Sequence, residues 1–147
     1  MIVPRIAALL FLAGCASGAA MNVPPLILDL LVPVPETLET DQARQALVTL
    51  EPAYAHAVRL YDSRDYAAAA EAFLAAARAA RGGPGTITRE VMAGNRGVCY
   101  RNAARAWFMA GVLDEKRALL EEAAREDPLC ATDIQEMIEI LRGREEI

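Results

Sequence analysis

The sequence predicts an all-α fold, and three observations support this class. Alanine supplies 30 of the 147 residues while aromatic residues supply only 5%, a composition that favours closely packed helices over a β-sandwich or barrel. From residue 37 onward, apolar residues recur at the helical spacing i, i+3, i+4 and i+7. No alternating strand pattern longer than four residues competes with this spacing. We therefore expect one helical domain over residues 37–147.

The helix boundaries follow from proline, glycine and capping residues. Pro52 suits the first turn of a helix, and the Gly-Gly-Pro-Gly run at 82–85 is a definite break. Thr88 can cap the following helix, Gly111 marks a tight turn, and Asp127-Pro128 stops the helix before it. The expected helices cover approximately residues 40–50, 52–63, 66–80, 88–110, 114–126 and 132–143.

The last of these helices is expected to cover one end of the domain as a C-terminal cap. Its residues Ile134, Met137, Ile138 and Leu141 form a single apolar stripe, and polar residues lie outside that stripe. The helix near 40–50 would cover the other end.

The N-terminus has the form of a secretory signal peptide over residues 1–14, with a short charged start and an apolar run. This run is too short to cross a bilayer, which takes about 20 residues. The run ends in Leu-Ala-Gly followed by Cys15, which resembles the lipobox of bacterial lipoproteins. The resemblance implies cleavage before Cys15 and acylation of that cysteine with fatty acids such as palmitate. Ala16, in place of aspartate, favours the outer membrane over the inner one, with the folded domain in the periplasm.

Residues 15–36 are expected to tether the domain to the lipid, because Gly18 and four prolines exclude a continuous helix. The apolar segment 26–31, Leu-Ile-Leu-Asp-Leu-Leu, is unusual for a free linker. It either packs back on the domain or forms a contact site, since exposed apolar runs are costly.

Two helix pairs repeat at an offset of 47 residues, which places Tyr66 on Leu113 and Arg64 on Gly111. The second pair alternates large and small residues in the order Tyr100, Ala104, Trp107, Gly111, Leu113, Leu120 and Ala123, followed by Asp127-Pro128. This pattern resembles the tetratricopeptide repeat. The resemblance implies a small right-handed stack of helical hairpins with about six helices. It also implies about 13 inserted residues between Gly82 and Asn95, because the usual period is about 34.

Composition and motifs argue against an enzyme. A net charge of −5 argues against nucleic acid as a partner, and one histidine with three cysteines leads us to expect no metal and no cofactor. His56 is expected to be a structural residue at a helix-packing position, because no catalytic triad can be assembled around it. The loop at 82–86 lacks the lysine of a phosphate-binding loop. A solvated helix face is expected for Glu121, Glu122, Glu126 and Asp127.

The tetratricopeptide resemblance implies a protein-binding groove lined by the first helix of each pair. The positions carried over are Tyr54, Val58 and Tyr61 from the first pair, and Arg101, Asn102, Arg105 and Phe108 from the second. Arg101 and Arg105 lie one helical turn apart and are expected to bind a carboxylate in fork geometry. The partner would be an envelope protein or peptide, bound by an interaction module or scaffold. The alternative is a structural subunit packed permanently on one envelope complex through segment 26–31.

Cys99 and Cys130 remain after lipidation of Cys15. Two cysteines in an oxidising periplasm can pair, and antiparallel helices place these two at the same end of the second hairpin. We expect a disulfide between Cys99 and Cys130, with two separate buried thiols as the alternative.

Overall fold

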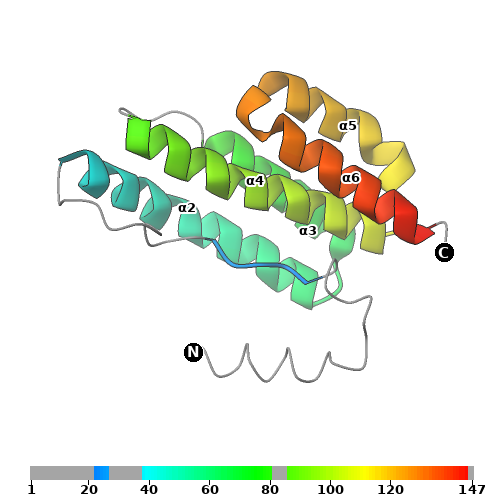
Figure 1. The fold of residues 1–147 in the computed structure, drawn as a ribbon. Coiled ribbons are helices and arrows are strands. Elements are labelled where there is room, and N and C mark those ends of the chain that lie inside the picture. Colours follow the sequence, from blue (N-terminus) through cyan, green and yellow to red (C-terminus); the bar gives the residue numbers. More distant parts are fainter. Residues whose placement is uncertain (1–21, 27–37, 81–85, 146–147) are drawn as a thin grey trace.

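The computed structural model describes residues 22–26, 38–80 and 86–145, and within these ranges the chain forms five α-helices and one short 3-10 helix (Figure 1). The all-α class is therefore confirmed. None of the described helices is long and apolar enough to cross a membrane. The signal peptide at 1–14, most of the tether at 15–36 and the break at 82–85 lie outside the described residues. The elements are α2 (Leu38–Asp62), α3 (Tyr66–Ala79), α4 (Thr86–Met109), α5 (Leu113–Glu126), η3 (Pro128–Cys130) and α6 (Ala131–Glu145).

Helix α2 replaces two of the six helices expected from the sequence, because it runs without a break through Pro52. Proline cannot donate the backbone hydrogen bond to the carbonyl of Val48, four residues earlier. Val48 and Pro52 both lie on the exposed side of the helix, where water can satisfy that carbonyl. Leu50 and Tyr54 on the opposite side are buried. Their packing holds the two halves together as one helix.

The helices form two units that match in helix length and spacing, α2 with α3 and α4 with α5. Tyr66 begins α3 and Leu113 begins α5, and the last residues, Ala79 and Glu126, are separated by the same 47 positions. Helices α2 and α4 also end 47 positions apart. The first helix of each pair is long, with 25 residues in α2 and 24 in α4. Of the range expected to hold the insertion, 82–85 lie outside the described residues and 86–95 belong to α4.

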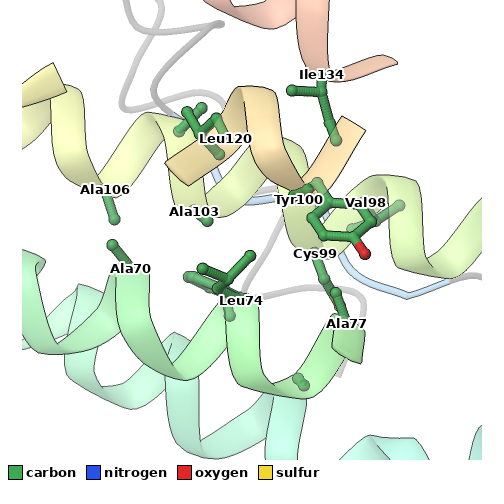
Figure 2. Packing of buried hydrophobic residues seen from close by; sticks show 14 of the residues in the cluster. Ala70, Leu74, Ala77, Val98, Cys99, Tyr100, Ala103, Ala106, Leu120 and Ile134 are labelled. Atoms are coloured by element: carbon green, nitrogen blue, oxygen red, sulfur yellow. The ribbon is translucent and has the colours of Figure 1, made fainter. Parts of the chain in front are cut away.

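Helix α4 is central, because it packs against α2 and α3 on one side and against α5 and α6 on the other (Figure 1). Ala70 of α3 faces Ala106 of α4, and their short side chains let the two helices approach closely (Figure 2). Gly97 has the same effect toward α6, since a Cβ atom there would lie 2.5 Å from Oδ2 of Asp133. Alanine and glycine thus set the helix spacing around α4.

The apolar stripe of α6 is buried as expected, at Ile134, Met137, Ile138 and Leu141. The helix packs against both α4 and α5. Its apolar face covers the second unit, and its outer face remains polar apart from the exposed Ile140.

Candidate interaction site

A row of three hydrogen-bonded polar side chains joins α2 to α4. The amide Nδ2 of Asn102 donates to the hydroxyl of Tyr54 over 2.9 Å, and the guanidinium of Arg105 donates to Oδ1 of Asn102. All three side chains are buried, with exposed fractions of 6% for Tyr54, 0% for Asn102 and 8% for Arg105. We call these residues the polar row. The tetratricopeptide resemblance placed all three in the expected groove, and the structure brings them together.

The polar row ends on an extended segment that precedes the helices. The hydroxyl of Tyr54 donates to the carbonyl of Pro24. Leu26 is buried in the hydrophobic core, and Val23 packs against the same core. We call residues 22–26 the strap, which runs along the C-terminal half of α2 in Figure 1. Leu26, the first residue of the apolar segment 26–31, therefore packs back on the domain, while 27–31 lie outside the described residues.

Burial keeps the hydroxyl groups around the polar row protonated. Desolvation raises the pKa of Tyr54 well above its usual value, and the hydrogen bond from Asn102 lowers it only in part. Desolvation also raises the pKa of Tyr61 to about 12, against a smaller lowering by the charge of Arg105. The pKa of Arg105 itself is lowered, first by burial and then by the positive charge of Arg101. The row therefore presents neutral hydrogen-bond donors beside one buried cation.

The two arginines of the expected fork point to different neighbours. Arg105 donates to Asn102 on its own helix, next to α2. Arg101 forms an ion pair with Asp133 of α6, with 3.0 Å between Nη1 and Oδ1. This arrangement does not provide a site in which both guanidinium groups bind one carboxylate. The charge of Arg101 is already neutralised by Asp133 of α6.

The remaining three expected groove residues are partly buried. Val58, Tyr61 and Phe108 pack against the hydrophobic core. The ring of Tyr61 also contacts Tyr66 edge to face, with 5.2 Å between the ring centroids. These residues extend the surface around the polar row toward the end of α2.

A second buried polar cluster was missed by the sequence analysis. Arg96 Nε donates to Asp127 Oδ2 over 2.7 Å and its Nη2 to Oδ1 over 3.2 Å, while the Tyr100 hydroxyl donates to Oδ2 over 3.1 Å. Arg96 also donates to the carbonyl of Ala80 over 3.3 Å. The expectation that Asp127 is solvated is therefore wrong. Only its position directly before Pro128 distinguished it from the glutamates of the same helix.

The cluster fixes the ends of α3 and α5 on α4 and shifts the pKa of its carboxylate. Burial alone would raise the pKa of Asp127, but the hydrogen bonds and charge of Arg96 and the Tyr100 hydroxyl outweigh burial and hold it below its usual value. The pKa of Arg96 is raised, first by its hydrogen bond to Asp127. We assign this cluster a structural role.

The expected disulfide is not formed in the structure, where Cys99 and Cys130 are both free and buried. The thiol of Cys130 donates to the carbonyl of Ala93 over 3.3 Å. Ala93 precedes Cys99 by six residues on α4, a rise of about 9 Å along the helix axis. The side chain of Cys99 lies beside Ala77 of α3 instead (Figure 2). The sulfur atom of Cys130 is therefore directed at the backbone of α4 between one and two turns before Cys99.

The single histidine does not lie at a packing position. His56 is exposed on α2, so the expectation that it occupies a helix-packing position is wrong. Among the described residues, no group of three or more histidine, cysteine, aspartate or glutamate side chains is arranged to hold a metal ion.

Comparison with family models, with curated proteins and with solved structures found no match for this chain.

Proposed function

We propose that the mature chain is a lipoprotein anchored through Cys15 to the outer membrane, and that its periplasmic domain is a tetratricopeptide-like module for protein-protein interaction or assembly. The observation that carries this proposal is the contact between the polar row and the strap. Residues assigned to a binding groove by the resemblance, including Tyr54, hold an extended peptide segment at the carbonyl of Pro24. A surface that binds one extended segment has the chemistry to bind another.

The two equivalent units support the tetratricopeptide-like part of the proposal. Each has a long helix followed by a 14-residue helix, and the C-terminal ends of corresponding helices are 47 positions apart. Buried alanines, such as Ala70 against Ala106, provide the small-residue contacts on which this repeat relies. The sequence Leu-Ala-Gly-Cys15 supports the anchor.

The alternative function is a subunit packed permanently on one envelope complex through segment 26–31. The burial of Leu26 is an argument against this alternative, because the side chain is only 8% exposed and packs in its own core. A residue covered by its own domain contributes little to a second interface.

Replacing Cys15 with serine tests the anchor. We expect the Cys15→Ser chain to leave the membrane fraction and to incorporate no fatty-acid analogue, because serine at this position is not acylated. Cys130→Ser is the matched control, since it removes a different cysteine and should remain labelled. Label that persists in the Cys15→Ser chain would overturn the proposed anchor.

A photoreactive amino acid placed at Tyr61 tests the interaction surface in the native envelope. Tyr61 is partly buried beside the polar row, and the same probe at the exposed Glu136 of α6 serves as the control. We expect a distinct crosslinked partner from position 61 and none from position 136. Identical products at both positions, or products from position 136 alone, would contradict this assignment of the surface.

A further inference from the structure

We propose that the strap is an intramolecular ligand. This rests on the proposed function. The partner would carry an extended segment with the pattern apolar-Pro-Pro-apolar, as in residues 23–26 of this chain. The partner segment would bind the polar row in place of the strap.

The strap meets the domain through features that any peptide of this pattern can supply. Prolines at 24 and 25 hold φ near −65° and favour the polyproline II conformation, in which three residues complete one turn. Val23 and Leu26, three residues apart, then lie on one face, and both pack against the core, whereas Pro25 is exposed. The apolar contacts therefore depend on side-chain spacing and not on the covalent connection to α2.

The hydrogen bond adds a preference for a carbonyl that precedes proline. The carbonyl of Pro24 belongs to the peptide bond with Pro25, and that bond carries no N–H group that would need a partner in the buried site. Tyr54 is the donor to this carbonyl.

The polar row is arranged to strengthen this donor. Arg105 donates to Asn102, Asn102 donates to Tyr54, and Tyr54 donates to Pro24, so all three hydrogen bonds run in the same direction. Such a chain polarises each bond in turn, and here it begins at a buried cation. Without an occupant, water would replace the carbonyl acceptor of the Tyr54 hydroxyl, but the apolar contacts that Val23 and Leu26 make with the core would be lost. The surface therefore favours being covered by either the strap or a partner.

The test converts the strap from a tethered segment into a dissociable one. In the chain from Ala16 onward, a protease site replaces residues 30–35, between the strap and α2. The probe is a fluorescent peptide of residues 20–28, and its binding is measured by fluorescence polarisation before and after cleavage. Before cleavage the tethered strap competes at an effective concentration of about 1 mM, so little binding is expected. After cleavage and dilution we expect at least about tenfold tighter binding.

Altered peptides and chain variants test which residues of the strap and of the polar row are needed for binding. A probe with Pro25→Ala, and one with Leu26→Ser, should each bind several-fold more weakly than the unaltered probe. In the cleaved chain, Tyr54→Phe should weaken binding, whereas Tyr61→Phe should not. An uncleaved chain carrying Val23→Ser and Leu26→Ser should bind the unaltered probe as the cleaved chain does, because its own strap has lost both apolar contacts.

Three results would overturn the inference. Equal binding before and after cleavage would mean that the probe binds elsewhere. Loss of helical circular dichroism when the strap dissociates, in both the cleaved chain and the serine variant, would make the strap a structural part of the fold. Failure of a folded cleaved chain to bind the probe would exclude a ligand role.

The crosslinking experiment at Tyr61 separates this inference from the proposed function. A partner that is captured there but not displaced by excess probe would leave the interaction module intact and overturn the ligand role of the strap. A probe that binds the cleaved chain while no partner is captured in the envelope would support the ligand role and contradict the proposed function.

Discussion

Arg64 and Gly111 occupy the same position in the two inter-helix turns, and both adopt a left-handed backbone with φ of 68° and 78°. The N–H of Arg64 donates to the carbonyl of Tyr61, and the N–H of Gly111 donates to that of Phe108, over 3.0 and 2.9 Å. The next residue in each turn donates five positions back, over 2.9 and 3.0 Å. Two sequences that share few side chains here thus form the same helix-ending turn.

This equivalence predicts that glycine is the more stable residue at both positions. An L-residue in the left-handed region costs about 1–2 kcal/mol, while glycine adds about 0.5–1 kcal/mol of entropy to the unfolded chain. We expect Arg64→Gly to stabilise the fold by about 0.5–1 kcal/mol and Gly111→Ala to destabilise it by about 1–2 kcal/mol. Urea unfolding measures both changes. Arg64→Ala is the control and should leave the stability nearly unchanged, because it retains a Cβ atom.

The buried pair of Arg96 and Asp127 predicts a large effect of removing the carboxylate. Asp127→Ala leaves the Arg96 guanidinium buried without its partner, a change that costs about 3–5 kcal/mol. Glu126→Ala is the matched control, because its pair with Arg78 is exposed and 3.6 Å long, and such pairs contribute about 0–1 kcal/mol. Urea unfolding distinguishes the two. Equal effects would contradict a structural role for the buried pair.

The lowered pKa of Asp127 predicts acid sensitivity. Its carboxylate contributes stability that is fully present above the unfolded-state pKa of about 3.9, and that contribution is lost as the pH falls through the lower folded-state pKa. An Asp127→Asn chain lacks this titration. We expect its free energy of unfolding to fall less between about pH 5 and pH 2 than that of the unaltered chain. Parallel pH profiles for the two chains would contradict the assigned pKa direction.

Pro52 predicts a stabilising substitution within α2. Proline inside a helix costs about 3 kcal/mol relative to alanine, and Pro52 is exposed, so its removal costs little packing. We expect Pro52→Ala to raise the stability by about 1–3 kcal/mol, measured by urea unfolding. Val48→Ala on the same exposed side is the control and should have little effect. A less stable Pro52→Ala chain would mean that the fold requires a bend at this position.

The two buried thiols are predicted to be unreactive in the folded chain. Burial, with a smaller contribution from the nearby Cys130, raises the pKa of Cys99 to about 12. Burial and the charge of Asp127 raise the pKa of Cys130 to about 12 as well. Because the thiolate is the reactive form, a thiol reagent at pH 8 should label neither residue until urea unfolds the chain.

Cys99→Ala provides the control, since it should release one thiol fewer on unfolding. An intact mass lower by the two thiol hydrogens, with no thiol released in urea, would instead demonstrate a Cys99–Cys130 disulfide.

The two proposals together predict how far the domain can lie from the membrane. Asn22 lies seven positions after Cys15, a reach of at most about 25 Å, whereas Leu38 lies 23 positions after Cys15, a reach of at most about 80 Å. Displacement of the strap should therefore lower energy transfer between a dye at Val48→Cys and a dye in the bilayer. The strap peptide should produce this change when added in excess, and its Leu26→Ser form should not.

The sequence by itself determined the features that depend on neighbouring residues along one helix. The all-α class, the turn at Gly111, the buried stripe of Ile134 and Leu141, and the 47-residue offset between the two units all follow from local spacing. These features are predictable because a helix repeats every 3.6 residues, so the spacing of apolar residues along the sequence identifies the face that is buried.

The tertiary structure decided the features that depend on groups from remote elements. Proline alone predicted a break at Pro52, but packing on the opposite face keeps α2 continuous. A carboxylate such as that of Asp127 is buried only because a guanidinium from another helix compensates its desolvation. Arg101 and Arg105 are equivalent in spacing, yet Arg101 pairs with Asp133 of α6 while Arg105 donates to Asn102 on its own helix. The polar row likewise required three elements to meet, since its bonds link the strap, α2 and α4 across separations of 30 and 48 residues.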